Sequence, residues 1–172
     1  GMGLTSWKEV DITMGTLGKA AGSFGAYIAC DNEIREYLVN FCYGLIYTTA
    51  LPPSVLGAID AALDLIPSMD REREEMFRKA DRLRKALNVL GFNTTASTTH
   101  IIPIVIGDED RTMSLSGWLE KNGILAVTFR YPSVAVGDSR IRLIVSASHK
   151  WEHIDMLIDL LSRWIDDKEI KT

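Results

Sequence analysis

The sequence predicts a mixed α/β protein, and three observations point to this class. Short apolar runs rich in β-branched residues alternate with longer segments of helical periodicity. Hydrophobic residues make up 47% of the 172 residues and charged residues 24%, which are values of a globular chain able to bury a core. The pattern also changes beyond Gly91, where β-branched runs follow two helical segments. We therefore expect a piece of a larger α/β layer over residues 1–66 and a compact α+β unit over 67–172.

The first part begins with two short strands around a glycine-rich turn. Apolar runs predict strands over residues 10–14 and 26–29, and the turn spans 15–25. Asp31 or Asn32 can cap the helix that follows. The apolar residues of that helix have helical spacing and are Ile34, Leu38, Phe41 and Leu45.

Two prolines mark the next boundary. Pro52 pushes Leu51 out of the helical region of backbone conformation, so the segment before it is irregular. Pro53 suits the first turn of a helix. We expect that helix over residues 54–66, with Pro67 ending it.

The second part contains amphipathic helices and β-branched strands. Strands are predicted over residues 101–106, 124–128 and 141–145, and helices over 72–90, 114–122 and 150–165. Arg140 and Arg142 alternate with Ile141 and Leu143, so one face of the sheet is solvated. We expect an antiparallel sheet with the helices 72–90 and 150–165 packed on one face.

Composition limits the function classes. The net charge of −4 argues against nucleic-acid binding, and no apolar run reaches the ~20 residues that span a bilayer. Cys30 and Cys42 lie in apolar surroundings and indicate reduced thiols in a cytoplasmic protein. His149 and His153 have the i, i+4 spacing of a metal pair at the start of a helix, but no cysteine or carboxylate is placed to complete a site. We therefore expect a helix-start histidine and a surface histidine, and no metal.

Lys19 is the candidate catalytic residue. It is surrounded by glycine and alanine and preceded three positions earlier by the hydroxyl of Thr16. Small neighbours let a cofactor ring approach the backbone, and burial would help the amine to lose its proton. The alternative is a loop lysine in a glycine-rich turn, which so loose a motif would by itself favour.

Several segments in order resemble the α-oxoamine synthase family of fold-type I enzymes, which depend on pyridoxal 5′-phosphate (PLP). They are Asp11-Ile-Thr-Met-Gly-Thr-Leu-Gly-Lys-Ala-Ala-Gly22, Tyr47-Thr-Thr-Ala-Leu-Pro-Pro53, His100-Ile-Ile-Pro-Ile-Val-Ile-Gly107, Arg130-Tyr-Pro-Ser-Val134, Arg140-Ile-Arg-Leu143 and Ser146-Ala-Ser-His149. The resemblance covers nearly the whole chain from residue 4. It implies the C-terminal part of a fold-type I transferase, with residues 1–66 from the PLP-binding large domain and 67–172 as the α+β small domain.

The resemblance also assigns residue roles. Lys19 would bind PLP covalently and later move the α-proton of the substrate, and Thr16 would contact the cofactor phosphate or its neighbourhood. Thr48 and Thr49 would reach the phosphate of the cofactor of a partner subunit, and Arg130 would hold the amino-acid carboxylate. Without the family, Thr48 and Thr49 could cap the following helix, and Arg130 could be a surface arginine.

The implied reaction is the decarboxylative condensation of an amino acid with an acyl thioester. The Thr-Ala-Leu-Pro-Pro form is most similar to members that use L-alanine and a pimeloyl thioester in biotin synthesis. Tyr43 and Ala135 depart from the family pattern, which bears on the acyl substrate.

The chains of the family are more than twice as long, and their first half supplies the residues that stack on the PLP ring and bind its nitrogen. We therefore expect this chain alone to be inactive and to bind PLP weakly or not at all. Its partner would be a second copy or the missing N-terminal half. The alternative is a non-catalytic α/β module that acts in assembly or is a remnant.

Overall fold

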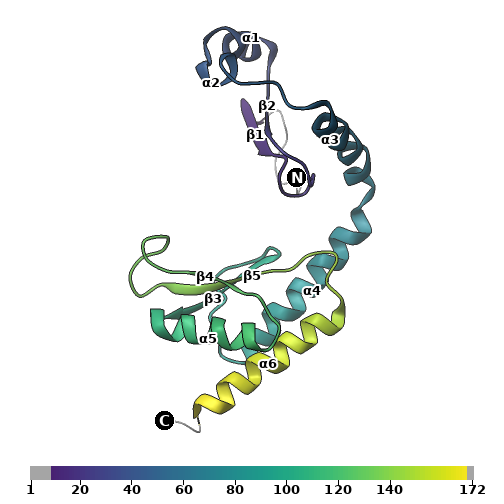
Figure 1. The fold of residues 1–172 in the computed structure, drawn as a ribbon. Coiled ribbons are helices and arrows are strands. Elements are labelled where there is room, and N and C mark those ends of the chain that lie inside the picture. Colours follow the sequence, from purple (N-terminus) through teal and green to yellow (C-terminus); the bar gives the residue numbers. More distant parts are fainter. Residues whose placement is uncertain (1–8, 170–172) are drawn as a thin grey trace. The chain divides into compact units, whose positions relative to one another are not determined.

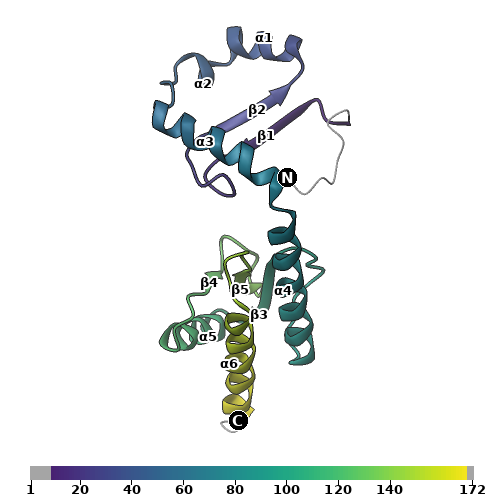
Figure 2. The same ribbon diagram turned by 90° about the vertical axis from the view of Figure 1, so that its right-hand side faces the viewer.

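The computed structural model describes residues 9–169, and the chain divides into two compact units between Met69 and Asp70. Unit 1, up to Met69, contains β1 (Ile12–Thr16), β2 (Ala26–Cys30), α1 (Asn32–Phe41), α2 (Tyr43–Ile46), α3 (Pro53–Leu65) and a short 3-10 turn, η2 (Ile66–Ser68). Unit 2, from Asp70, contains α4 (Asp70–Val89), β3 (Ile101–Gly107), α5 (Glu109–Lys121), β4 (Val127–Phe129), β5 (Ser139–Ile144) and α6 (Trp151–Glu169). Each unit is described by itself (Figures 1 and 2).

Unit 1 is organised around an antiparallel hairpin. β1 pairs with β2 from Ile12 opposite Cys30 to Thr16 opposite Ala26, and Figure 2 shows both strands along their length. β1 lies two residues later than the strand predicted over residues 10–14. β2 starts where predicted and is one residue longer than the predicted strand over 26–29. The turn between them is tied across its base, because the Leu17 N–H donates to the Gly25 carbonyl oxygen at 2.9 Å.

The single helix predicted to carry the apolar residues from Ile34 to Leu45 is broken at Cys42, so that prediction is wrong. Cys42 has φ −84° and ψ 98°, an extended conformation that separates α1 from the four-residue α2. Asp31 precedes α1 as predicted, but its side chain makes no capping hydrogen bond. The apolar spacing therefore continues across a backbone break.

Unit 2 confirms the predicted antiparallel sheet. Its order is β3-β5-β4, with Ile104 opposite Ile141 and Thr128 opposite Ile141 in the two pairings. The helices α4, α5 and α6 lie on the same face of the sheet (Figure 1). Pro103 is tolerated inside β3 because that strand lies at the edge, where a missing N–H disturbs the sheet least.

The core of unit 2 fills the space between the sheet and these helices. Ile102, Ile104, Ile141 and Leu143 point inward, and they pack with Ala80, Leu83, Leu87, Leu115, Leu119, Ile154, Leu157, Leu161 and Trp164 from the helices. α5 begins five residues earlier than predicted. Asp108 caps it by accepting a hydrogen bond from the Arg111 N–H at 2.7 Å.

Burial differs sharply between the units. Among the described residues of unit 1, only Leu17 is buried, and many large apolar side chains are exposed, including Phe24, Tyr37, Phe41 and Tyr43. Unit 2 holds the remaining buried hydrophobic residues. Within residues 9–169, no helix has the length and apolarity that crossing a lipid bilayer would take.

Candidate functional site

Lys19 lies in the turn that connects β1 to β2. Its carbonyl oxygen accepts a hydrogen bond from the Gly22 N–H at 3.0 Å, and the Ser23 N–H binds the Leu17 carbonyl oxygen at 3.0 Å. Gly22 and Gly25 have φ values of 58° and 102°, which glycine adopts without strain. The backbone on both sides of the lysine is thus held in place, while the lysine side chain is exposed.

Thr16 is the last residue of β1 and is paired with Ala26. The structure therefore places this hydroxyl at the junction of strand and turn, three residues before Lys19. Its side chain is exposed, like that of the lysine. The two residues that the sequence pattern linked belong to one local element.

A second segment of unit 1 packs against the lysine turn. The Ser23 hydroxyl donates to the Val55 carbonyl oxygen at 3.3 Å. A Cβ on Gly25 would stand 3.0 Å from Cδ1 of Leu51, so the turn and the start of α3 approach closely. These contacts bring the Leu51–Val55 region to the turn that carries Lys19.

Thr48 and Thr49 precede this contact region and do not cap α3. The residue at the cap position is Pro52, and no side chain makes a capping hydrogen bond there. The alternative interpretation of the two threonines as helix caps is therefore wrong. Both threonines are exposed.

Arg130 belongs to unit 2, where it directly follows β4. Its guanidinium lies 2.6 Å from the Glu109 carboxylate, with 54% and 48% of the two side chains exposed. Arg130, which we expect to bind the carboxylate of the substrate, thus pairs with a carboxylate of the chain itself, that of Glu109. Because exposed ion pairs contribute only about 0–1 kcal/mol, a ligand carboxylate could displace Glu109 at little cost.

Sequence reasoning missed Glu109. The signal was present, since Asp108, Glu109 and Asp110 form the acidic start expected of a helix. The helix predicted from the apolar residues starts at residue 114 and so does not include these acidic residues, which form the first turn of α5.

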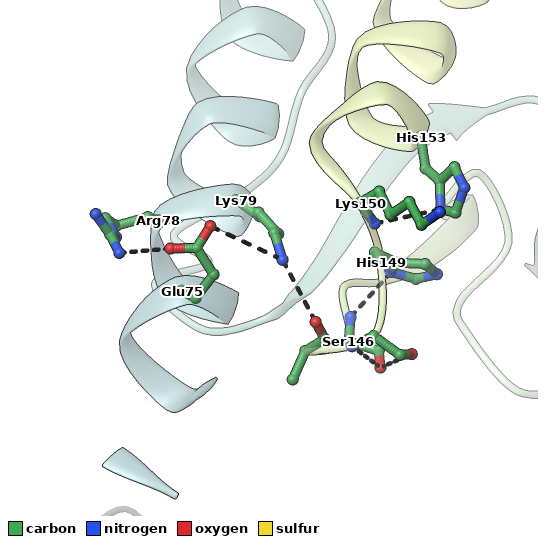
Figure 3. A network of polar contacts seen from close by, with 9 residues as sticks. Glu75, Arg78, Lys79, Ser146, His149, Lys150 and His153 are labelled. Atoms are coloured by element: carbon green, nitrogen blue, oxygen red, sulfur yellow. Dashed lines mark hydrogen bonds and ion pairs between the residues drawn. The ribbon is translucent and has the colours of Figure 1, made fainter. Parts of the chain in front are cut away.

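A second cluster of titratable groups lies in unit 2 where β5 leads into α6 (Figure 3). The Ser146 N–H donates to Nδ1 of His149 at 3.0 Å, and the Lys150 N–H donates to Nδ1 of His153 at 3.3 Å. In each pair the backbone N–H of the histidine donates to the backbone carbonyl oxygen of the residue three positions earlier, at 3.2 Å. We call these two pairs the histidine boxes. They share one bond with a helix capping box, namely the side chain that accepts from the backbone N–H three residues earlier, while the return bond is made by the backbone.

The boxes define the chemistry of the two imidazoles. A nitrogen that accepts a hydrogen bond from a backbone N–H must carry a lone pair, so Nδ1 of each ring acts as an acceptor in this arrangement. Burial lowers the pKa of His149, and electrostatic interactions with His153 and Lys79 lower it further. Among the described residues, no group of three side chains is arranged to hold a metal ion.

Comparisons with known proteins add family information to this geometry. The profile described as aminotransferase class I and II matches residues 4–161. A curated relative from Desulfosudis oleivorans, provisionally named an 8-amino-7-oxononanoate synthase, is 51% identical over 164 residues, or 95% of this chain and 43% of its own length. The 8-amino-7-oxononanoate synthase of Gluconacetobacter diazotrophicus is 46% identical over 152 residues, covering 88% of this chain and 38% of its own. The chain thus spans about two fifths of the length of these relatives.

Solved structures show the same fold. Serine palmitoyltransferase of Sphingomonas wittichii aligns with a TM-score of 0.86 at 23% identity, covering 91% of this chain and 40% of its own. A structure described as SPT with PLP internal aldimine aligns with a TM-score of 0.85 at 22% identity, covering 90% and 39%. The 8-amino-7-oxononanoate synthase of Francisella tularensis gives 0.80 at 24% identity, covering 92% and 46%. The likeness confirms the predicted fold class, that of the C-terminal part of a fold-type I PLP-dependent transferase.

Proposed function

The chain belongs to the aminotransferase class I and II family, and on that premise we propose that it is the C-terminal part of a PLP-dependent acyltransferase. The reaction would condense an amino acid, L-alanine, with an acyl thioester, pimeloyl thioester, and release carbon dioxide and the free thiol, as in biotin synthesis. The observation that carries this proposal is the lysine turn, because it holds Lys19 three residues after Thr16 on a backbone fixed by its own hydrogen bonds. The names of the two curated relatives support the choice of substrates.

The residues of unit 1 fit the cofactor in their chemistry. Lys19 supplies a primary amine for the PLP aldehyde, and Thr16, Thr48 and Thr49 supply hydroxyl donors for its phosphate. The exposure of the lysine side chain leaves its amine accessible. PLP, when bound, supplies an electron sink for the carbanion that forms when the substrate loses a group at its α-carbon.

Each residue then has one task. Lys19 would bind the cofactor and carry a proton to or from the substrate α-carbon at its Nζ. The threonine hydroxyls would fix the phosphate end. Arg130 would orient the amino-acid carboxylate through its planar guanidinium after Glu109 has been displaced.

The same proposal extends to organisation. Unit 1 would be a fragment of the PLP-binding large domain, and unit 2 would be the small domain. The partner would be a second copy or a chain that carries the remaining part of the fold, which would cover the exposed apolar residues of unit 1. The place of action would be the cytoplasm.

A chimera tests the proposal. The matching region of the Desulfosudis oleivorans relative, to which this chain is 51% identical, would be replaced by this chain. We expect the chimera, with PLP, to form the amino-ketone product from L-alanine and pimeloyl thioester, and Lys19→Ala to abolish product formation. A folded chimera that forms no product while the unmodified relative does would favour the alternative of a non-catalytic module.

A further inference from the structure

Unit 2 contains a cavity of about 220 Å³ at the edge of its sheet. The cavity exists because β4 is short. Its pairing with β5 ends at Val127 opposite Arg142, so Leu143 and Ile144 of β5 continue without a strand on that side. Leu125 and Val127 form part of the apolar wall, and His149 and His153 line the cavity from the start of α6.

The imidazoles of the histidine boxes present hydrogen-bond donors. Because Nδ1 of each ring accepts from a backbone N–H, the proton of the neutral ring resides on the other nitrogen, Nε2. The ring centres lie 6.1 Å apart, and Figure 3 shows His149 on the turn before α6 and His153 on the first turn of α6. The backbone of this turn therefore fixes two Nε2–H donors.

Arg142 adds a third donor group. Its guanidinium carbon lies 4.3 Å from the centre of the Phe129 ring, and its Nε is buried without a hydrogen-bond partner among the described residues. A buried donor without a partner costs free energy, and an acceptor from a ligand would remove that cost. No Asp or Glu is among the described residues that line the cavity.

We propose that this cavity binds the carboxylate of a short aliphatic acid. The polar groups of the lining described above are donors and the remaining wall is apolar, which matches an anion with a hydrocarbon tail. A volume of about 220 Å³ lies below the ~300–1,000 Å³ of pockets for drug-sized molecules, so the ligand is small. This site lies within unit 2 and does not depend on Lys19 or on the proposed transferase reaction.

The test uses the full chain without PLP and sodium hexanoate as the probe. The sequence contains three histidines, so selective labelling of their rings gives an NMR spectrum with few signals. At about pH 8, well above the ordinary histidine pKa of ~6.5, we expect hexanoate to shift the Nε2 signals of His149 and His153 in a saturable way. We expect hexanamide, the neutral analogue, to bind roughly tenfold more weakly or worse, because a charged acceptor makes the stronger hydrogen bonds.

Matched variants distinguish the Nε2–H donor of each ring from its Nδ1 acceptor, which binds the backbone N–H. In His149→Asn and His153→Asn the amide oxygen can replace Nδ1 as the acceptor, but the Nε2–H donor is lost. We expect each of them to weaken hexanoate binding by roughly tenfold. His153→Gln reaches the Nε2 position and should bind better than His153→Asn. Arg142→Gln leaves both histidine boxes intact and should weaken hexanoate binding by a similar factor. This variant tests the proposal even where a histidine-to-asparagine variant does not fold.

Four results would overturn the proposal. The first is equal affinity for hexanoate and hexanamide, and the second is unchanged binding in Arg142→Gln and in the folded asparagine variants. The third is a titration that does not saturate by roughly 10 mM hexanoate. The dissociation constant would then lie above the millimolar range of specific small ligands. Inorganic phosphate that binds as tightly as hexanoate would also contradict it, since the apolar wall would then contribute nothing. None of these results depends on whether the transferase proposal holds.

Discussion

The ammonium of Lys79 reaches from α4 to the carbonyl oxygen of Ala147, 3.4 Å away, in the turn before α6. Only 6% of the Lys79 side chain is exposed, and its charge lies 5.9 Å from the centre of the Trp151 ring. The nearest carboxylate, Glu75, is 4.0 Å away and also pairs with Arg78. Lys79 is therefore a buried cation that joins two elements of unit 2.

We expect Lys79→Ala to lower the free energy of unfolding of unit 2 by about 1–3 kcal/mol, because packing of the lysine stem and the hydrogen bond to Ala147 are both lost. Lys79→Met keeps most of the stem and should lose less. Urea unfolding followed by tryptophan fluorescence measures this, since Trp118, Trp151 and Trp164 all lie in unit 2. Equal losses in the two variants would show that the stem contributes nothing.

The histidine boxes predict that unit 2 loses stability in mild acid. The pKa of His149 is lowered by burial and by His153 and Lys79, so the unfolded chain binds its proton more readily than the folded chain. The contribution of neutral His149 to the free energy of unfolding is complete above the pKa of the unfolded chain, ~6.5. It is lost as pH falls through the lowered pKa of the folded chain. Protonation also removes the lone pair that accepts from Ser146.

The charges around His149 support this direction. Lys79 faces it from α4, and Arg142 from β5 lines the same cavity, while Glu75 is engaged by Arg78. Urea midpoints measured from about pH 8 down to about pH 5, above the range where most carboxylates titrate, should fall for the wild type and fall less for His149→Asn. A midpoint that rises on acidification would contradict the prediction.

We expect the isolated chain to bind PLP weakly. Lys19, Thr16, Thr48 and Thr49 are all exposed, so no desolvated pocket strengthens their contacts with the cofactor. Borohydride reduction followed by peptide mapping should label Lys19 only slightly more than other lysines, and Lys19→Ala should scarcely change the PLP affinity. Tight binding that Lys19→Ala abolishes would prove this expectation wrong.

Unit 1 should make the isolated chain self-associate. Tyr37 and Phe41 stack on each other with ring centres 4.9 Å apart, yet 63% and 64% of their surfaces are exposed. Large uncovered apolar surfaces favour association. Light scattering should show a mass above that of a monomer, and the double variant Tyr37→Ser/Phe41→Ser should lower it. A monomer at high concentration would contradict this.

The sequence predicted unit 2 better than unit 1, for physical reasons. The alternation of Arg140 and Arg142 with Ile141 and Leu143 marks a sheet with one buried face, and the structure places the latter pair in the core. The break between α1 and α2 could not be predicted in this way. Cys42 carries no proline or glycine signal, and the apolar spacing runs on across it.

The candidate site shows a similar division. Thr16 and Lys19 are neighbours in sequence, so a local motif was enough to link them. Arg130 and Glu109 are 21 residues apart, and only the packing of β4 beside α5 brings them together. The donors of the cavity were missed for a related reason. The spacing of His149 and His153 indicated a helix start, but not the backbone N–H groups that bind the two rings.

The order β3-β5-β4 has a consequence for synthesis of the chain on the ribosome. β5 is the middle strand of the sheet and the last of the three to be translated, and α6, which supplies much of the core, follows it. A nascent chain that has emerged only as far as β4 holds two strands that do not pair with each other. The sheet can therefore close only after β5 has emerged, and until then the exposed strands depend on protection from aggregation.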